Sequence, residues 1–147
     1  MGTSRNLYNA IIDVATELKD AGAVTADGAA QVGGAARVVN VGEGLVQGVL
    51  IVDVDALTTA GGAGGPETYD IILQGSTSPT FASDVNELMR IRFSVAEGYL
   101  LGRFARAVTN TEQGGTLMPY LRVYHDVGGN APSISYRAFL TISPLRG

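Results

Sequence analysis

The sequence predicts an all-β fold, an antiparallel β-sandwich or barrel that follows a short N-terminal helix or arm. Three observations support this prediction. After residue 20, about seven segments show the two-residue hydrophobic period of strands, Gly, Pro, Asn and Ser turns separate them, and no convincing helical pattern lies between them. Strands spaced in this way are typical of antiparallel sandwiches and barrels rather than of doubly wound sheets. The chain of 147 residues has the size of one domain, which we divide into a helix or arm at residues 1–20 and a β-sandwich at residues 21–147.

The N-terminal segment has a helical rather than a strand pattern. Through residues 4–19 an apolar residue recurs every three or four positions, which places one apolar stripe on a helix. The stripe consists of Leu7, Ile11, Val14 and Leu18. Such a helix either packs on its own domain or docks as an arm on a neighbouring chain, and in the second case Leu7 and Ile11 are candidate contacts. Residues 20–35 are mostly Ala, Gly and small polar residues, so we expect a loop or extended connector there with at most one short strand.

The strand pattern begins at residue 36. The predicted strands are residues 36–41, 45–57, 67–75, 86–95, 102–110, 116–127 and 134–142. In the second of these the even positions are apolar or small, whereas the odd positions include Asp53 and Asp55, so one face is dry and the other partly wet. Pro119 falls inside the sixth, which suggests a sheet edge or a bulge at that point.

The glycine-rich segment TTAGGAGGPET, residues 58–68, is predicted to be a plain connection between two strands. A phosphate-binding glycine loop leads from a strand into a helix, whose N-terminal amides meet the anion. Here the loop leads into another strand and lacks the GK[ST] ending. The alternative is that residues 61–65 become ordered against a partner, at an entropic cost.

The charge composition argues against nucleic-acid and membrane partners and favours contacts with other proteins. The chain has 14 acidic and 10 basic residues, whereas a protein that coats nucleic acid normally carries a basic excess. Charged residues make up only 16% of the chain, below the roughly 25% of an ordinary soluble domain, which suggests that other chains cover part of its surface. No run of about 20 apolar residues occurs, so no transmembrane helix is expected.

No arrangement of residues indicates catalysis, a metal site or a cofactor, so we do not expect an enzyme. The chain has no cysteine, which excludes disulfides and thiol chemistry. Its one histidine, His125, is followed by Asp126, but neighbouring residues on a strand point to opposite faces. Asp53 and Asp55 share a strand face and could serve acid–base chemistry or bind calcium, yet no further carboxylate has the spacing of a metal loop. The alternative for this pair is a solvated strand end or pairing with Arg across the sheet.

Two clusters on predicted strands are candidate contacts with a partner. Arg90 and Arg92 share one face of their strand, where they bind an acidic neighbour or belong to a solvated face with weak cross-strand ion pairs. Tyr120 and Tyr124 flank Arg122 on one face of a later strand, and Tyr with Arg is the composition of an interface hot spot. The same ladder also suits a sugar-binding platform, or core packing with polar tips.

Three segments carry a resemblance to a known family. They are ARVVNVGEGLVQGVLIVDVDAL, then YDIILQGSTSPTFASDVNEL after the glycine-rich loop, and then PYLRVYHDVGGNAPSISYRAFLT. Together they lie within residues 36–142 and resemble the small capsid cement, or decoration, proteins of tailed bacteriophages, of the Bordetella-phage type. The family's LQxSxxxxF segment and its late RYLRLxY strand are matched here by Leu73, Gln74, Ser76 and Phe81 and by Tyr120, Leu121, Arg122, Val123 and Tyr124.

The resemblance implies a jelly-roll-like β-sandwich on the outer surface of a phage head, without enzymatic activity. Such proteins form symmetric dimers or trimers that bridge major capsid subunits. The expected partners are therefore the major capsid protein and further copies of this chain, with no nucleic acid, membrane, metal or cofactor. The candidate interface residues are Leu7, Ile11, Arg90, Arg92, Tyr120, Arg122 and Tyr124. The alternative is a carbohydrate- or receptor-binding β-sandwich of a phage surface structure, with a site formed by Tyr120, Tyr124 and the Asp53/Asp55 pair.

Overall fold

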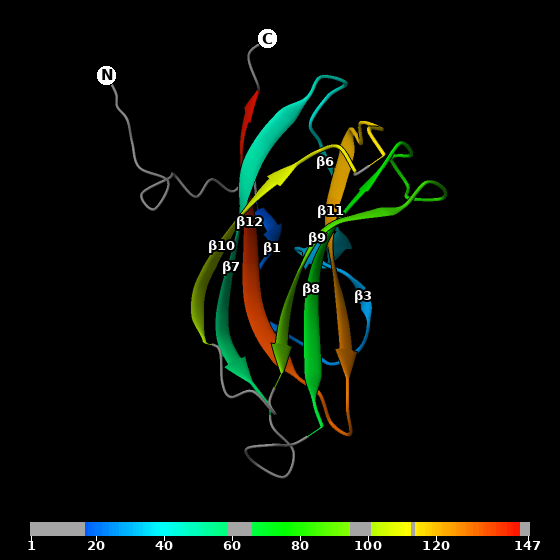
Figure 1. Ribbon diagram of the computed structural model, residues 1–147. Helices are drawn as coiled ribbons and strands as arrows, with labels where there is room; N and C mark the ends of the chain where they lie inside the picture. The colour runs from blue at the N-terminus through cyan, green and yellow to red at the C-terminus, as the bar shows by residue number, and fades with distance from the viewer. Residues whose placement is uncertain (1–16, 59–65, 95–100, 113, 145–147) are drawn as a thin grey trace, which may run out of the picture.

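The computed structural model describes residues 17–58, 66–94, 101–112 and 114–144, and over these residues the fold is a β-sandwich, as predicted. Two antiparallel sheets pack against each other, and none of the described residues is helical (Figure 1). The core lies between the two sheets.

Each sheet is named here after one of its central strands, β7 and β8. The β7 sheet contains, in spatial order, β1 (Glu17–Lys19), β12 (Ile134–Pro144), β7 (Val46–Leu57) and β10 (Gly102–Thr109), with β2 (Ala23–Val24) also paired to β12. The β8 sheet contains β3 (Gly28–Ala29), β11 (Tyr120–Gly128), β8 (Thr68–Ser76) and β9 (Asn86–Ser94), with β6 (Val39–Asn40) also paired to β11. A separate hairpin joins β4 (Gln31–Val32) to β5 (Ala35–Ala36). Among the six long strands, β7 to β12, the chain crosses between the sheets after β7, β9, β10 and β11, so strands distant in sequence become neighbours.

The six long strands, β7 to β12, confirm the strands predicted from residue 45 onward. In β7 the even positions Leu50, Val52 and Val54 face the core, whereas Asp53 and Asp55 lie on the outer side. This is the alternation expected of a strand with one buried face. Core-facing residues also alternate in β8, at Tyr69, Ile71 and Leu73, but all five residues from Tyr69 to Leu73 are buried. Aromatic and β-branched composition therefore identified this strand, rather than a hydrophobic period.

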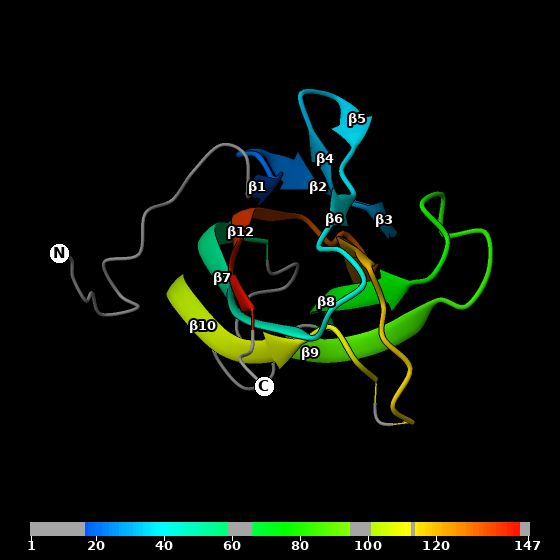
Figure 2. The same ribbon diagram turned by 90° about the horizontal axis from the view of Figure 1, so that it is seen from above.

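The core is a single cluster that the two sheets enclose from opposite sides. Its largest fully buried side chains are Tyr69 on β8 and Tyr136 on β12, one from each sheet. Seen from above, β9 and β10 lie alongside each other on one flank of the sandwich (Figure 2). There Phe93 and Phe104 meet edge to face with ring centroids 5.1 Å apart, which closes the core between two strands that are not hydrogen-bonded to each other.

The predicted N-terminal helix is wrong at its C-terminal end, where Glu17–Lys19 form β1. Leu18, assigned by its spacing to a helical stripe, is fully buried in the sandwich core. Pairing of β1 with β12 satisfies the backbone and directs this side chain inward, and such tertiary burial outweighs a weak local preference for helix. The remainder of that prediction, with the candidate contacts Leu7 and Ile11, lies outside the described residues.

The segment between residues 20 and 41 holds more strand than predicted. It contains β2 to β6, each two residues long, and β2 pairs with β12 whereas β3 pairs with β11. The strand predicted at residues 36–41 is interrupted, since only Val39 and Asn40 form β6. β2, β3 and β6 pair with the edges of the long strands β12 and β11, whereas β4 and β5 pair only with each other. Strands of two residues are too short to show a hydrophobic period.

Two predicted breaks in the strand pattern lie near the expected places. The glycine-rich segment connects β7 to β8, so it does join strand to strand, although residues 59–65 lie outside the described part of the chain. Pro119 was expected at an edge or a bulge, but β11 begins just after it. Since Pro119 precedes the strand, its missing N–H removes no hydrogen bond from the sheet. Its carbonyl still accepts a hydrogen bond of 2.7 Å from the amide of Val41.

Asn110, fully buried at the end of β10, fastens the start of β7 to the rest of the sandwich. Its side-chain oxygen accepts a hydrogen bond of 2.9 Å from the amide of Val46, and its Nδ2 donates one of 2.9 Å to the carbonyl of Gly44. We expect Asn110→Ala to lower the free energy of unfolding by about 2 kcal/mol, because it leaves the buried amide of Val46 without its hydrogen-bond acceptor. Urea denaturation provides the measurement.

Asn40→Ala is the matched control. The Asn40 side chain is exposed and accepts only a loop hydrogen bond, from the amide of Gly42, so its loss should cost less than about 0.5 kcal/mol. Equal destabilisation by the two substitutions would contradict the role given to Asn110.

Candidate partner-binding face

The outer surface of the β8 sheet brings together five of the seven candidate interface residues. They are Arg90, Arg92, Tyr120, Arg122 and Tyr124, supplied by β9 and β11. On β11 the odd positions Leu121 and Val123 are in the core, so the even positions face outward. We call this surface the β8 face.

The strand registers arrange the β8 face as a grid. Because β11 and β9 pair with opposite edges of β8, each outward residue of β8 lies between one residue from each neighbour. The three cross-strand rows are Arg122, Gln74 and Glu87; Tyr124, Ile72 and Arg90; and Asp126, Asp70 and Arg92. Cross-strand neighbours on one face are close enough to interact directly, so the grid forms one continuous surface.

Arg90 and Arg92 are engaged within the chain. Arg92 binds the carboxylate of Asp70 through two hydrogen bonds of 2.8 Å, and Arg90 binds the same carboxylate and that of Glu87. The side chain of Asp70 is only 5% exposed, and its hydrogen bonds from Arg92 hold the pKa of Asp70 below its usual value despite burial. This network fastens β8 to β9, so replacing both arginines would also leave a buried carboxylate without a partner.

Arg122 has a different environment from the other two arginines of the face. Its Nε donates a hydrogen bond of 2.8 Å to Oε1 of Gln74. The central carbon of its guanidinium lies 4.2 Å from the ring centroid of Phe81 and 5.6 Å from that of Tyr124. Burial lowers the pKa of Arg122, and no carboxylate of the described residues lies within ion-pair distance of it. The side chain is thus a charged group fixed by an amide and an aromatic ring.

Phe81 occupies an unfavourable backbone conformation in the loop between β8 and β9. Its φ is 57°, in the left-handed region, which costs a bulky residue on the order of 1–2 kcal/mol. The ring is nevertheless buried, against the guanidinium of Arg122. Residues in such conformations cluster at functional sites, where the surrounding structure holds them.

Sequence reasoning did not select Gln74 and Phe81 as candidate site residues, although both belong to the LQxSxxxxF segment. The structure places both of them against Arg122, which belongs to the other quoted segment. The signal was therefore present in the two motifs, but the contact between them depends on the pairing of β8 with β11.

The predicted separation of His125 and Asp126 is confirmed. Asp126 is exposed on the β8 face, whereas His125 is 5% exposed and points into the sandwich. There Nδ1 of His125 lies 2.8 Å from the hydroxyl of Tyr136, which belongs to the other sheet. Burial and the nearby charge of Lys19 lower the pKa of His125 to about 4. The imidazole is therefore neutral at pH 7 and links the two sheets.

Asp53 and Asp55 lie on the outer side of the β7 sheet, on the opposite side of the sandwich from Tyr120 and Tyr124. Asp53 binds Arg103 across the strands with hydrogen bonds of 2.7 and 2.8 Å, so the alternative of pairing with Arg across the sheet is confirmed for Asp53. The site expected for a carbohydrate-binding module, which combined these four residues, is therefore not assembled. Among the described residues no three His, Asp or Glu side chains are grouped so that they could hold a metal ion.

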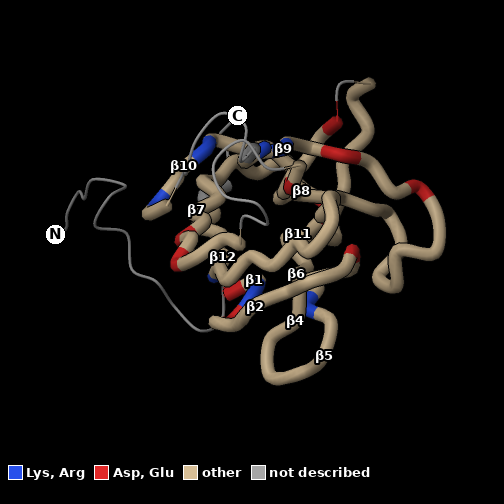
Figure 3. Tube along the Cα trace, turned by 90° about the horizontal axis from the view of Figure 1, so that it is seen from below, with Lys and Arg blue, Asp and Glu red and all other residues tan. Residues whose placement is uncertain are grey.

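Charges on the described chain are interspersed rather than separated by sign. Figure 3 shows acidic and basic positions next to one another along β8 and β9. The β8 face carries three arginines and three carboxylates, namely Arg90, Arg92, Arg122, Asp70, Glu87 and Asp126. The face is formally neutral, which does not favour a polyanion such as nucleic acid.

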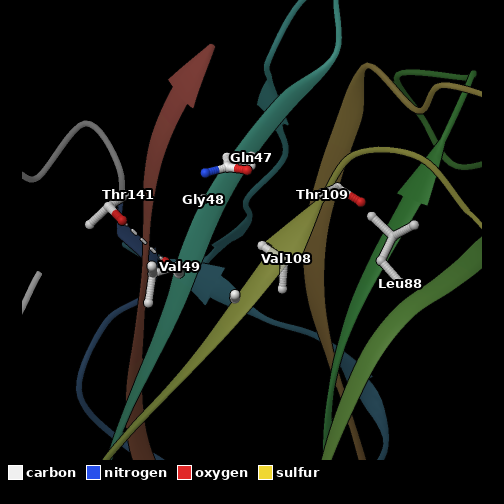
Figure 4. Close-up of a pocket in the computed structure, with 8 residues that line it drawn as sticks. Gln47, Gly48, Val49, Leu88, Val108, Thr109 and Thr141 are labelled. Carbon is white, nitrogen blue, oxygen red and sulfur yellow. Dashed lines mark hydrogen bonds between the residues drawn. The ribbon is translucent and has the colours of Figure 1, made fainter. Parts of the chain in front are cut away.

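A hollow of about 380 Å³ lies near one end of the β7 sheet (Figure 4). It is lined by Gln47, Gly48, Val49, Leu88, Ala107, Val108, Thr109 and Thr141. None of these side chains is ionisable, so the hollow offers shape and a few polar groups but no acid–base chemistry. Close packing of Gly48 against β12 forms one wall.

No family model, curated protein or solved structure matches the chain. The described residues contain no helix that is both long and apolar enough to cross a membrane.

Proposed function

We propose that the protein is a structural component of a tailed-phage virion, which binds the outside of the head and stabilises it by bridging major capsid subunits. The proposal rests on the resemblance of residues 36–142 to capsid cement proteins. The observation that carries it is the β8 face, where Tyr120, Arg122 and Tyr124 form an ordered aromatic–arginine ladder on a rigid sheet. Such a ladder has the composition of a protein–protein hot spot.

The stabilising effect follows from mass action. A protein that binds only the assembled, expanded lattice lowers the free energy of that state relative to every other state. A dimer or trimer that engages several capsid subunits at once gains effective concentration, so each single contact can be weak. A sandwich tied together by long strands and by the Asp70 network presents its face without loss of conformational freedom on binding.

Co-sedimentation with bare expanded heads of the phage that encodes the chain tests this proposal. We expect the wild-type protein to pellet with the heads and to reach saturation. The double substitution Tyr120→Ser and Tyr124→Ser should weaken this binding by on the order of tenfold or more, because it removes the aromatic part of the ladder.

Gln47→Ser, an exposed position on the β7 sheet, is the matched control and should bind as the wild type does. Protein that stays in the supernatant at excess heads would refute the capsid role. Full binding by the double Tyr variant would show that the β8 face does not contribute to binding of the heads.

A further inference from the structure

Among the described residues, Arg122 lacks the carboxylate counterion that Arg90, Arg92, Arg103 and Arg137 possess. Arg90 and Arg92 bind Asp70, Arg103 binds Asp53, and Arg137 binds Glu17. The guanidinium of Arg122 is more desolvated than those of Arg90, Arg92 and Arg103. No carboxylate of the described residues lies within 4.0 Å of it. A partly buried charge without a partner is unfavourable, and a carboxylate supplied from outside would correct this.

The geometry around Arg122 leaves part of its guanidinium available. Gln74 occupies Nε, and the rings of Phe81 and Tyr124 cover the guanidinium plane. The terminal nitrogens Nη1 and Nη2 form no hydrogen bond with the described residues. A guanidinium offers paired N–H donors that match a carboxylate, and the surrounding rings exclude water and strengthen the attraction.

We propose that Arg122 is the anchor of the β8 face and binds the carboxylate of an Asp or Glu side chain on a partner protein. This inference rests on the proposed function in one respect, that the β8 face is the docking surface, and it names the chemistry of the partner. Tyr120 and Tyr124 contact the apolar surroundings of that acidic residue.

The charges on the rest of the face favour a single carboxylate over a polyanion. Glu87 lies in the row of Arg122 but two strands away, Asp126 lies four residues further along β11, and both are exposed. A phosphate backbone would bring many negative charges close to both of these carboxylates. A single acidic side chain on an otherwise neutral protein surface would instead pair with the one unpaired arginine. Such charge complementarity determines which partner proteins the face binds.

Selection from a displayed library of random dodecapeptides tests the inference without knowledge of the natural partner. The purified full-length protein should enrich peptides that carry Asp or Glu at one recurring position beside apolar residues. Changing that peptide residue to its amide should weaken binding by on the order of tenfold. Arg122→Gln should cause a similar loss, and the two changes together should cause little more than either alone, as expected of a direct contact.

Arg106→Gln is the matched control, since Arg106 is an exposed arginine of β10 without an ion pair among the described residues. It should bind the selected peptides as the wild type does. If Arg122→Gln proves unstable in thermal unfolding, Arg122→Lys replaces it in the test. Lysine keeps the positive charge but lacks the paired N–H donors of the guanidinium, so this variant should retain only part of the affinity. Inorganic phosphate should compete no better than acetate.

Failure to enrich acidic peptides, or equal binding by Arg122→Gln, would overturn the inference. Stronger competition by phosphate than by acetate would overturn it as well. These outcomes are separable from the capsid role: heads that bind the protein while acidic peptides do not would refute the anchor alone. Peptides that bind through Arg122 while heads do not would refute the capsid role alone.

Discussion

Acidification from pH 6.5 to about pH 4 is expected to remove roughly 3 kcal/mol from the free energy of unfolding, through His125 alone. The imidazole is buried between the sheets and bonded to the hydroxyl of Tyr136. In the unfolded chain its pKa has the ordinary value of 6.5, whereas in the folded protein it is lowered to about 4. Between these values the unfolded state binds the proton and the folded state does not.

The sign of the effect follows from this difference. The contribution of His125 is fully present above pH 6.5, decreases as the pH falls, and is lost once the pH reaches about 4. The groups that face the imidazole are Lys19 on β1, whose charge lowers the pKa of His125, and Asp27, whose charge raises it. Lys19 is itself fixed, since its Nζ donates to the carbonyls of Asp20, Gly22 and Tyr136 at 2.8 Å.

The pKa shifts of two carboxyl groups, Asp70 and Asp126, have different effects on stability as the pH falls. The pKa of Asp70 is lowered by Arg92, so its stabilising contribution persists to lower pH and is lost only as the pH falls below the ordinary range of a carboxyl. Asp126 is exposed, but partial desolvation of its carboxyl and the charge of Asp27 raise the pKa of Asp126, so protonation of Asp126 favours the folded state as the pH falls. The loss between pH 6.5 and 4 is therefore assigned to His125.

His125→Asn separates this contribution from the others. An asparagine places an amide near the position of Nδ1, where it can still bond Tyr136, but it does not titrate. Urea denaturation at a series of pH values should give a variant that is less stable at pH 7 and nearly independent of pH between 6.5 and 4. Parallel pH profiles for the variant and the wild type would refute the assignment.

Gly48→Ala is expected to lower the free energy of unfolding by about 3 kcal/mol, because β7 and β12 approach too closely at this point for a side chain. A Cβ atom on Gly48 would lie 2.1 Å from the carbonyl oxygen of Thr141 and 3.2 Å from its carbonyl carbon. Both are backbone atoms of β12, which pairs with β7 over eleven positions. Relief of the contact requires a shift of the central strands of the β7 sheet.

Gly44→Ala provides the control for the loss of a glycine from the chain. Gly44 has no atom within 4 Å of an added Cβ and no positive φ, so the variant should be as stable as the wild type or more stable by up to about 1 kcal/mol. Thermal and urea unfolding measure both variants. Equal stability of Gly48→Ala and Gly44→Ala would refute the close approach.

On the β8 face, the alternation of residues along each strand predicted which side chains share a side, but not which strands lie next to each other. Parity alone put Tyr120, Arg122 and Tyr124 on one side of their strand, and Arg90 and Arg92 on one side of theirs. It did not indicate that the two strands flank β8, because the chain visits the other sheet as β10 between them. Nor did it indicate that Asp70 takes both arginines of β9 while Arg122 receives only an amide and a ring.

Hydrophobic period and β-branched or aromatic composition by themselves determined the six long strands and hence the sandwich, because a half-buried strand encodes its dry side locally in every second residue. The tertiary structure decided the fate of segments without such a period. Leu18 became part of β1, and β2, β3 and β6 formed as two-residue strands, because the edges of β11 and β12 supply partners that no local pattern specifies. It also decided that His125 is enclosed and that Arg122 is left without a carboxylate, since both outcomes depend on which distant strands become neighbours.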